Sequence, residues 1–318
     1  MITNAKIVAA DYDPQAYHKQ DAQRGTPEFV MSRSQLCEFS RCPSRWKDGY
    51  ERKDSDATNY GSLIDCLVLS SDKYGMKFAV KPALYMDKET AEMKWSPTSK
   101  VCREWAAEQK SAGVEPIDQG DEDEAQKAVA KLYADTQIAA YLKSSAKQVY
   151  CTAEWHDQSG VVIPLKVLID LAPDKSNGAY GRTLGDFKTT RDAGLRSWAK
   201  SVNQYDYHVQ AALFLDVYNA ATGEERNDFR HVVQENIAPY QPAKRYLSRE
   251  FIIGGRNAYR VALNYYSDCL ASNTWPDYDH SSNMHVNGWA CCEPDVWMMK
   301  NWPGALPETK SEISDYRH

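Results

Sequence analysis

Three consecutive segments near the middle of the chain have the composition and alternation of β-strands, and they constrain the fold more than any other feature. They cover residues 149–157, 161–173 and 180–190, and they are rich in β-branched and aromatic residues. Short turn sequences at 157–160 and 175–178 separate them, and the Asn-Gly pair in the second favours a tight reversal. We therefore expect three antiparallel strands in sequence order.

Segments in which apolar residues recur every three or four positions flank these strands, and they predict helices. The first begins after residue 31, where Ser32 or Ser34 can accept hydrogen bonds from the free amides of the first turn. Pro43 marks the point where this helix ends and the next begins. Further helices are predicted at residues 60–70, 196–220 and 255–272, a short strand within 72–82, and extended segments at 228–240 and 244–253.

The chain is expected to form one domain with additions at both ends and one insertion. Its 318 residues can bury a substantial core without disulfides. Residues 1–30 are expected to be a loosely held arm, residues 31–280 the domain, and residues 281–318 an irregular tail. A mostly helical insertion is predicted at about 83–148. The acidic run at 115–124 inside it is interpreted as a solvated loop and helix start, with a DNA-mimicking surface as the alternative.

Composition narrows the class of protein. No apolar run approaches the ~20 residues that a membrane helix needs, and the first residues lack the pattern of a secretory signal. Lys and Arg total 38 against 44 Asp and Glu, a net charge of −6, so the global basic excess of many nucleic-acid binders is absent. A local basic groove stays possible. The eight cysteines form no CxxC pair, which predicts reduced thiols in a cytoplasm.

Two of the central strands carry acidic residues in an apolar setting. Asp170 lies near the end of a strongly apolar strand, where a carboxylate is costly to bury unless it is paired or binds a metal. Asp186 and Lys188 are two residues apart on the next strand, so their side chains project from the same face. The acid-x-Lys triplet itself is common, because it occurs at four other places in the chain.

Two carboxylates on adjoining strands beside a lysine suit metal-dependent hydrolysis of a phosphodiester. Hard oxygen ligands favour Mg²⁺, which polarises the phosphate and lowers the pKa of a bound water. A neighbouring lysine can orient that water and neutralise developing charge. We expect Asp170, Asp186 and the backbone carbonyl of Phe187 to hold the ion, with Mn²⁺ as a substitute. A surface hairpin with solvated charges is the alternative.

The order of these features resembles the RecB-like branch of the PD-(D/E)XK nuclease superfamily. It is most similar to the C-terminal nuclease domain of RecE-type phage exonucleases (exodeoxyribonuclease VIII). The resemblance covers roughly residues 30–280. The stretches that carry it are Ser32-Arg33-Ser34 with Cys42-Pro43, the helix from Gly61, the strand 165–171, Asp186-Phe187-Lys188-Thr189, the helix with Gln210, the strand VVQENIAPY, and Trp275-Pro276.

The resemblance implies an α/β restriction-endonuclease-like core, a mixed central sheet flanked by helices. It implies a Mg²⁺-dependent exonuclease that degrades duplex DNA ends from 5′ to 3′ and exposes single strands for recombination. A phage or prophage origin in a bacterial cytoplasm, a ring-like homo-oligomer and a single-strand annealing protein as partner are also implied. The alternatives are a related nuclease of another task, structure-specific or of CRISPR-adaptation type, and a non-catalytic DNA-binding protein on a decayed scaffold.

Four further residues are compared with the family pattern. Asp65 stands where the family has histidine, and a carboxylate can also bind a divalent ion; otherwise it is a helix-surface acid. Glu154 is either a supporting carboxylate near the metal or a strand-edge partner of a lysine. Gln210 is expected to hydrogen-bond a phosphate or the nucleophile, or else to be a polar residue on a helix face. Phe214 replaces a tyrosine and lacks its hydroxyl.

Two stretches carry a local excess of positive charge. Residues 181–200 hold five Lys or Arg against two Asp, and residues 240–260 hold five against one Glu. Tyr240, Tyr246 and Tyr259 interleave with the second group, which suits a groove that follows a nucleic-acid strand. A solvated helix face is the alternative. The residues predicted to contact DNA are Arg182, Arg191, Arg196, Lys244, Arg245 and Arg249.

Cys42, Cys291 and Cys292 raise the question of a metal cluster. Some RecB-like nucleases join an N-terminal Cys-Pro to a C-terminal cysteine group through an iron–sulfur centre, which needs four cysteines. Adjacent Cys291 and Cys292 have the wrong spacing for such a centre. A zinc site that adds His280 and His285 is the other option. We expect plain buried thiols and no iron–sulfur cluster.

Overall fold

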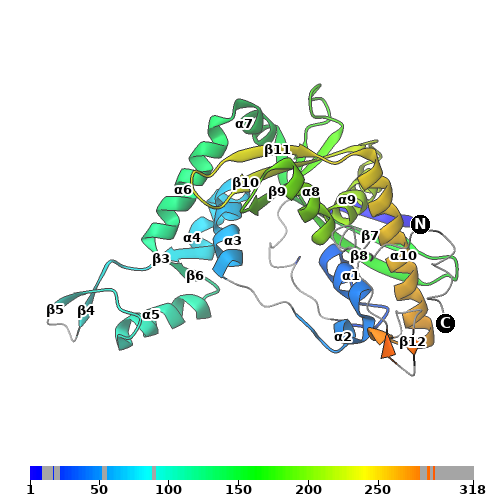
Figure 1. Cartoon of the computed structure of the whole chain (residues 1–318), viewed down its shortest axis with the longest axis horizontal. Helices are drawn as coiled ribbons and strands as arrows, with labels where there is room; N and C mark the ends of the chain where they lie inside the picture. The colour runs from blue at the N-terminus through cyan, green and yellow to red at the C-terminus, as the bar shows by residue number, and fades with distance from the viewer. Residues whose placement is uncertain are drawn as a thin grey trace, which may run out of the picture.

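A mixed sheet forms the centre of the molecule (Figure 1). The computed structural model describes residues 1–8, 17, 22–51, 56–87, 91–279, 285–286 and 289–290. Within them the main sheet has the order β1-β7-β8-β9-β10-β11, and β2 pairs with β8. Its strands are β1 (Ile2–Ile7), β2 (Met31–Ser32), β7 (Ser145–His156), β8 (Val162–Pro173), β9 (Thr183–Thr190), β10 (Asp228–Glu235) and β11 (Pro242–Tyr246).

The direction of the strands confirms the mixed α/β fold. β1, β7, β8 and β9 are antiparallel in turn, β10 is parallel to β9, and β11 is antiparallel to β10. A parallel neighbour needs a crossover, and here two helices supply it, α8 (Leu195–Gln204) and α9 (Tyr207–Thr222). The three central strands lie where the sequence predicts them, although β7 begins four residues earlier.

The turn between β7 and β8 shows why the sequence reverses there. Asp157 Oδ1 accepts hydrogen bonds from the backbone amides of Ser159, at 2.9 Å, and Val161, at 2.8 Å. An aspartate that bonds its own following backbone stabilises a turn without help from the rest of the fold. Local chemistry therefore sets this reversal, and the register of the two long strands follows from it.

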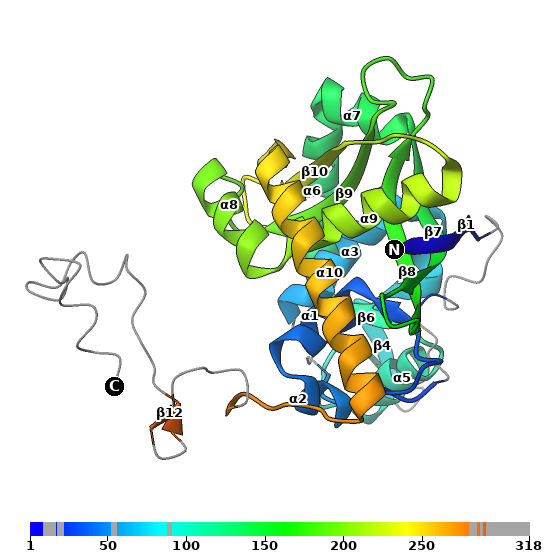
Figure 2. The same ribbon diagram turned by 90° about the vertical axis from the view of Figure 1, so that its right-hand side faces the viewer.

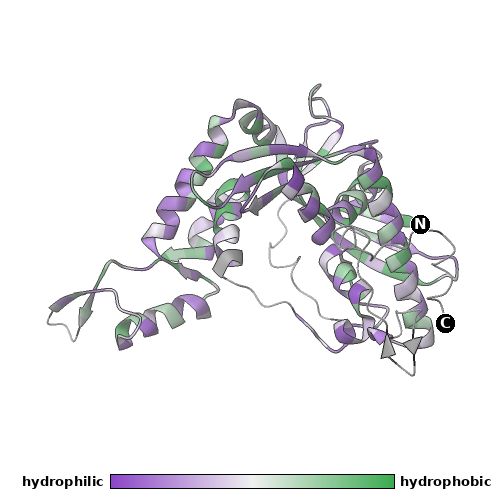
Figure 3. Cartoon of the chain, viewed as in Figure 1, coloured by the Kyte–Doolittle hydropathy of each residue, from purple (hydrophilic) through white to green (hydrophobic). Residues whose placement is uncertain are grey.

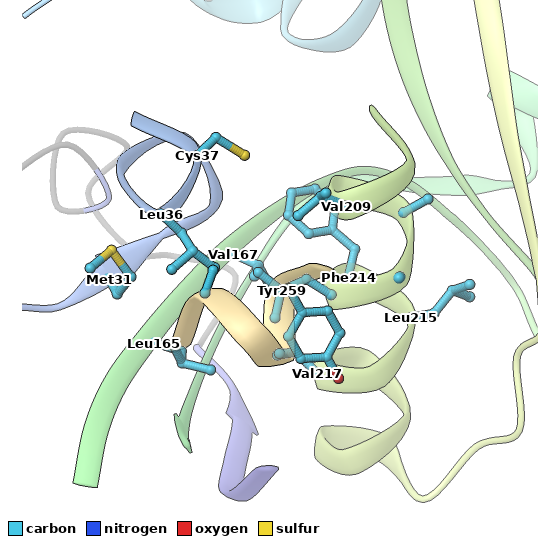
Figure 4. Close-up of a cluster of buried hydrophobic side chains, with 14 of the residues drawn as sticks. Met31, Leu36, Cys37, Leu165, Val167, Val209, Phe214, Leu215, Val217 and Tyr259 are labelled. Atoms are coloured by element: carbon cyan, nitrogen blue, oxygen red, sulfur yellow. The ribbon is translucent and has the colours of Figure 1, made fainter. Parts of the chain in front are cut away.

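The first hydrophobic core lies between the sheet and the helices α1 (Arg33–Arg41), α9 and α10 (Arg249–Ser272). Ser32 begins α1 as predicted, since its side chain accepts from the amide of Gln35, and Pro43 begins α2 (Pro43–Lys47). In Figure 4 Leu36 of α1 and Val167 of β8 lie toward side chains of α9. Figure 2 shows α9 and α10 in front of the sheet and α3 behind it.

The second core covers the opposite face of the sheet. It is formed by α3 (Asp56–Leu69), α6 (Gln119–Ala134) and α7 (Thr136–Lys143), with Phe187 and Val232 from the sheet. The prediction that residues 83–148 are an insertion is therefore wrong for its second half, because Leu132 and Tyr141 are core residues. In Figure 3 hydrophobic colours gather on the strands, and the projecting parts carry more hydrophilic ones.

The first half of the predicted insertion does project from the core and is less helical than expected. It contains β4 (Leu84–Asp87), β5 (Ala91–Lys94) and α5 (Lys100–Ser111), which stand away from the sheet at the left of Figure 1. β6 (Glu115–Ile117) pairs with β3 (Phe78–Val80), the short strand predicted within 72–82. A short helix, α4 (Tyr74–Lys77), and a 3₁₀ turn at Ser71–Lys73 join α3 to β3.

Three other predictions are corrected by the structure. Residues 1–30 are not only a loose arm, because Ile2–Ile7 form β1 at the edge of the main sheet, paired with β7. The single helix predicted at 196–220 is broken at Asp206, whose backbone is left-handed with φ 56°. The strand predicted at 228–240 ends at Glu235, and α10 begins at Arg249 within the segment predicted as extended.

The predicted irregular tail at 281–318 lies outside the described residues apart from two short paired strands, β12 (His285–Val286) and β13 (Trp289–Ala290). Across the part of the chain that the structure describes, no helix combines the length and the apolar character needed to cross a membrane.

Candidate metal and active site

The strands β8 and β9 separate at their acidic residues, and this separation opens the candidate site. They form one ladder pair, between Leu171 and Gly185. Asp170 precedes Leu171 on β8, and Asp186 follows Gly185 on β9, so the two aspartates are the adjacent positions of these antiparallel strands. There the backbone amide of Phe187 donates to the side chain of Asp170, at 3.0 Å from Oδ2, instead of continuing the ladder. Both aspartates therefore lie at the point where the sheet opens.

The strand β2 occupies the gap that this separation leaves. It pairs in parallel with Leu165 and Lys166 of β8, on the edge of β8 opposite to β7. Because α1 begins directly after β2, the pairing carries the N-terminus of α1 to the site. The pairing thus places the Ser-Arg-Ser stretch that the resemblance includes beside residues 134 positions away in the chain.

Asp186 is the centre of a buried network of polar side chains. Its carboxylate is 1 % exposed, and Lys188 Nζ forms an ion pair with its Oδ2. Gln210 of α9 donates from Nε2 to Asp186 Oδ1 at 2.6 Å. Lys188 Nζ also lies 3.3 Å from the carbonyl oxygen of Phe187. The structure thus brings together four of the predicted residues, Asp170, Asp186, Lys188 and Gln210, with the carbonyl of Phe187.

The charges of this network follow from burial and from each other. Burial raises the pKa of Asp170 well above its ordinary value, and the neighbouring Asp186 raises it further. Burial also opposes ionisation of Asp186, but the ammonium of Lys188, together with smaller effects of His231 and Asp170, outweighs it and holds the pKa of Asp186 below its ordinary value. Asp170 therefore binds a proton more readily than Asp186, and Asp186 keeps its charge more readily than Asp170.

Lys188 keeps its positive charge in spite of its burial. Desolvation works to lower the pKa of the ammonium, but the carboxylates of Asp186 and Asp170 overcome it and raise the pKa of Lys188. The ring of Tyr207, whose centroid is 5.4 Å from Nζ, adds a face that favours a cation. A lysine in this state donates hydrogen bonds and supplies charge, and it does not accept a proton at neutral pH.

Asp65 reaches the same region from α3. Burial raises its pKa to about 6, with Lys188 lowering it and Asp186 raising it. One turn earlier, a Cβ at Gly61 would lie 2.8 Å from Thr189 Oγ1, so the glycine lets α3 approach β9 closely. Asp65 nonetheless stands apart from the two strand carboxylates, because no three His, Cys, Asp or Glu side chains form a preformed metal-binding group among the described residues.

The donors present fit a hard divalent cation. Asp186 Oδ2 is buried and, within the described residues, has no hydrogen bond of good geometry, which leaves its ion pair with Lys188. Asp170 and the carbonyl of Phe187 supply two more oxygens on the same side of the opening. Carboxylate and carbonyl oxygens suit Mg²⁺ or Mn²⁺. Asp170, Asp186 and Phe187 would therefore hold the ion, and Asp65 is a further candidate ligand on α3.

Glu154 and Phe214 do not belong to the site. Glu154 accepts from Asn4 at 2.7 Å and lies 3.1 Å from His156, and its partner in β8 is Pro164. Asp170 is six residues further along that strand, about 20 Å away. The predicted supporting role of Glu154 is therefore wrong, and its partner is a histidine, not a lysine. Phe214 is buried in the first core.

The basic residues predicted to contact DNA divide into two groups. Lys244 is bound to Asp135 at 2.5 Å, and Arg245 donates to the backbone carbonyls of Ala193 and Lys244. Tyr259 is buried and donates to Asp216, so the predicted aromatic groove over residues 240–260 is wrong in this part. Arg182, Arg191, Arg196 and Arg249 are exposed, and so is Lys244 in spite of its ion pair.

Two residues of the network were missed at the level of sequence. Arg33 donates to Gln210 Oε1 at 2.7 Å, and His231 lies opposite Asp186 in the β9–β10 ladder. His231 is buried against Trp198, with ring centroids 5.1 Å apart, and neither of its nitrogens has a hydrogen-bond partner among the described residues. The only sequence signals were the charged residue inside Ser-Arg-Ser and a histidine inside an apolar strand.

The cysteines considered for a cluster are only partly described. Cys42 and Cys269 are buried free thiols, and burial raises the pKa of Cys269 to about 11. Cys291, Cys292 and His280 lie outside the described residues, so the expectation of plain thiols at these positions, with the iron–sulfur and zinc sites as alternatives, stays a prediction.

Comparison with known proteins agrees with this geometry. Residues 32–285 match a family described as a PDDEXK-like domain of unknown function (DUF3799). Among solved structures the chain is similar to a crystal structure of a protein described as "Putative exonuclease" from Eubacterium rectale, at 13 % identity and a TM-score of 0.53, over 93 % of this chain and 100 % of that one. At this identity the likeness shows the fold alone. Among curated proteins none matches.

Proposed function

The chain belongs to this family of PDDEXK-like domains, and so to the PD-(D/E)XK nuclease superfamily, and we propose that it is a metal-dependent deoxyribonuclease. One observation carries the proposal. The buried pair of Asp186 and Lys188 lies beside Asp170 where β8 and β9 separate, so that two carboxylates and an ammonium face one opening. A fold that only needed stability would gain little from burying these charges.

Each residue has a role that follows from its geometry. Asp170, Asp186 and the carbonyl of Phe187 would hold the ion, and Asp65 of α3 would be a further ligand. When bound, the ion polarises the scissile phosphate and lowers the pKa of a water ligand. Lys188 remains charged, so it stabilises negative charge on the phosphate and orients the attacking water, and it is not the general base. Gln210 holds Asp186 in place through Oδ1.

The finer assignment rests on the family resemblance. We propose a Mg²⁺-dependent exonuclease that acts on duplex DNA ends from 5′ to 3′, as a homo-oligomer, and supplies single strands to an annealing protein during phage-type recombination. The order of the RecE-type stretches along the chain supports this task. A RecB-like nuclease of another task and a decayed scaffold are outcomes of the tests.

The test is cleavage of labelled duplex DNA by the purified chain in Mg²⁺, in Mn²⁺ and in excess chelator. We expect cleavage with either ion and none with chelator. Asp186→Asn should abolish cleavage, because it removes the charged ligand and the partner of Lys188, while DNA binding measured by mobility shift persists.

The matched control is Glu154→Gln, a carboxylate on the neighbouring strand that lies outside the site. It should cleave at the wild-type rate. If Asp186→Asn cleaves normally, this site is excluded. If the wild type binds DNA and cleaves it with neither ion, the decayed-scaffold alternative is correct.

A further inference from the structure

Arg33 lies behind the proposed metal site and touches none of the proposed ligands. It is the first residue of α1, and it is half-buried. Its Nη2 donates to Gln210 Oε1 at 2.7 Å, and its Nη1 lies 3.4 Å from the carbonyl oxygen of Tyr205. Its guanidinium carbon is 6.0 Å from the centroid of the Tyr207 ring. Arg33 therefore bridges the start of α1 and the start of α9.

The contacts of Gln210 require one orientation of its amide. Arg33 can only donate hydrogen bonds, and the ionised Asp186 can only accept them. The amide must therefore present Oε1 to Arg33 and Nε2 to Asp186 Oδ1, as it does. The reverse orientation would place donor against donor and acceptor against acceptor. Gln210 is 5 % exposed, so water cannot replace either partner.

We propose that Arg33 is a positioning residue, which fixes the amide of Gln210 and through it the carboxylate of Asp186. With Oδ1 held by Gln210, the second oxygen, Oδ2, is directed to Lys188 and to the proposed ion. This inference rests on the proposed metal-dependent function and deepens it, because it assigns the orientation of the central ligand to a residue on a distant helix. Second-layer hydrogen bonds of this kind typically change metal affinity 10–100-fold.

The alternative role for Arg33 is a direct contact to a DNA phosphate, since arginine is well suited to phosphate. The two roles differ in whether the effect of Arg33 depends on Gln210. A positioning role passes entirely through Gln210, so it vanishes when Gln210 is removed. A phosphate contact is independent of Gln210 and changes the KM for DNA. A double-mutant cycle separates the two, because interacting residues are non-additive.

The experiment measures Mn²⁺ binding by isothermal titration calorimetry in the absence of DNA. Arg33→Met keeps the aliphatic stem over Tyr207 and removes the donors, and Gln210→Ala removes the amide. We expect each to weaken Mn²⁺ binding about tenfold, and the double variant to be no weaker than Gln210→Ala. Arg33→Lys, which retains the charge and one donor nitrogen but not the planar fork, should lie between Arg33→Met and the wild type.

The matched control is Arg41→Met, which removes the same charge from the same helix but pairs with Glu38 and Asp206. It should bind Mn²⁺ like the wild type, and thermal unfolding by circular dichroism checks that each variant is folded. If Arg33→Met does not fold, the double-mutant cycle with Gln210→Ala is measured with Arg33→Lys in its place.

Three results would overturn the inference. These are wild-type Mn²⁺ affinity in Arg33→Met, additive losses in the double variant, or a raised KM for DNA at unchanged Mn²⁺ affinity. If the wild type binds Mn²⁺ but cleaves no DNA, only the proposed nuclease function fails, and the double-mutant cycle still tests the role of Arg33. If the wild type binds no ion, the proposed function and the role of Arg33 both fail.

Discussion

The positive charge of Lys188 determines what a single side chain contributes to this site. It is buried, yet its pKa is raised by two carboxylates, so it is charged at neutral pH. A fixed charge next to the reacting phosphate needs no reorganisation during the reaction. It also competes with a cation for Asp186, because both are attracted to the same oxygen.

Replacement of Lys188 is predicted to separate turnover from metal binding. Lys188→Met should lower kcat about 10²-fold or more, the size typical of losing one preorganised donor, while Mn²⁺ binds as well as before or more tightly. Steady-state kinetics and calorimetry on the same preparation measure both. Equal losses of affinity and turnover would instead show that Lys188 supports the ligands.

Substitutions of Asp65 test whether the aspartate that stands in place of the RecE-type histidine is a metal ligand. Asp65→Ala should raise the Mg²⁺ concentration needed for half-maximal activity about tenfold, and Asp65→His should retain part of the activity, since imidazole also binds divalent ions. A titration of activity against Mg²⁺ measures the shift. Wild-type behaviour of both variants would mean that Asp65 is only an acid of the helix.

His231 predicts how stability depends on pH. Burial lowers its pKa from 6.5 to about 4, so the folded chain binds fewer protons than the unfolded chain between these values. Stability is therefore retained above pH 6.5 and lost as the pH falls toward 4. Between pH 7 and pH 5 this residue should cost about 2 kcal/mol. Urea unfolding of wild type and His231→Phe at both pH values measures the difference.

Burial raises the pKa values of Asp65 and Asp170, so their contribution to stability falls as the pH rises, opposite to that of His231. Both aspartates are present in the wild type and in His231→Phe. The comparison with His231→Phe therefore isolates the histidine. The same loss of stability in His231→Phe would show that other groups cause it.

At the scale of elements, the packing of α10 on α9 holds the helix that carries Gln210. Gly255 faces the first turn of α9, where an added Cβ would overlap the carbonyl of His208 and lie 3.0 Å from the amide nitrogen of Val209. The contact is backbone against backbone, so no side chain can move aside. The close approach of the two helices therefore depends on a glycine at this position.

Two adjacent glycines of α10 provide a matched test of this packing. Gly255→Ala should destabilise the fold by about 1–3 kcal/mol, as overpacking does, and should also weaken activity by moving α9. Gly254→Ala has open space around it and should stabilise by about 1 kcal/mol through helix propensity. Chemical denaturation measures both. Equal effects of the two changes would show that α10 is not in close contact at Gly255.

At the scale of the whole molecule, acidic residues outnumber basic ones, so any contact with the DNA backbone must come from local groups. The chain carries a net charge of −6, and Lys244 is already paired with an acid. The exposed arginines Arg182, Arg191, Arg196 and Arg249 remain candidates for the phosphate backbone. DNA affinity should then depend on few contacts and fall moderately with salt, because each neutralised phosphate adds to the slope.

The form of the DNA substrate tests the proposed task. If the molecule is an exonuclease, linear duplex should be consumed in Mg²⁺ while covalently closed circles survive, since closed circles have no ends. Gel electrophoresis of an equal mixture of both forms measures this in one tube. Rapid nicking of closed circles would identify an endonuclease.

Local sequence was sufficient for the parts of this protein that depend on near neighbours. The central strands follow from alternation and turn chemistry, the start of α1 from the hydroxyl of Ser32, and the shared face of Asp186 and Lys188 from the period of a strand. These features are set by backbone geometry over a few residues, so they can be read without knowing the fold.

Only the tertiary structure decided which distant residues meet. β2 enters the gap between β8 and β9 and brings Arg33 to Gln210, across 177 residues of chain. The same packing buries His231 and removes Tyr259 from any groove, and it places Glu154 about 20 Å from Asp170. Such contacts depend on how the layers pack and where a ladder ends, and no periodicity along the chain records either of these.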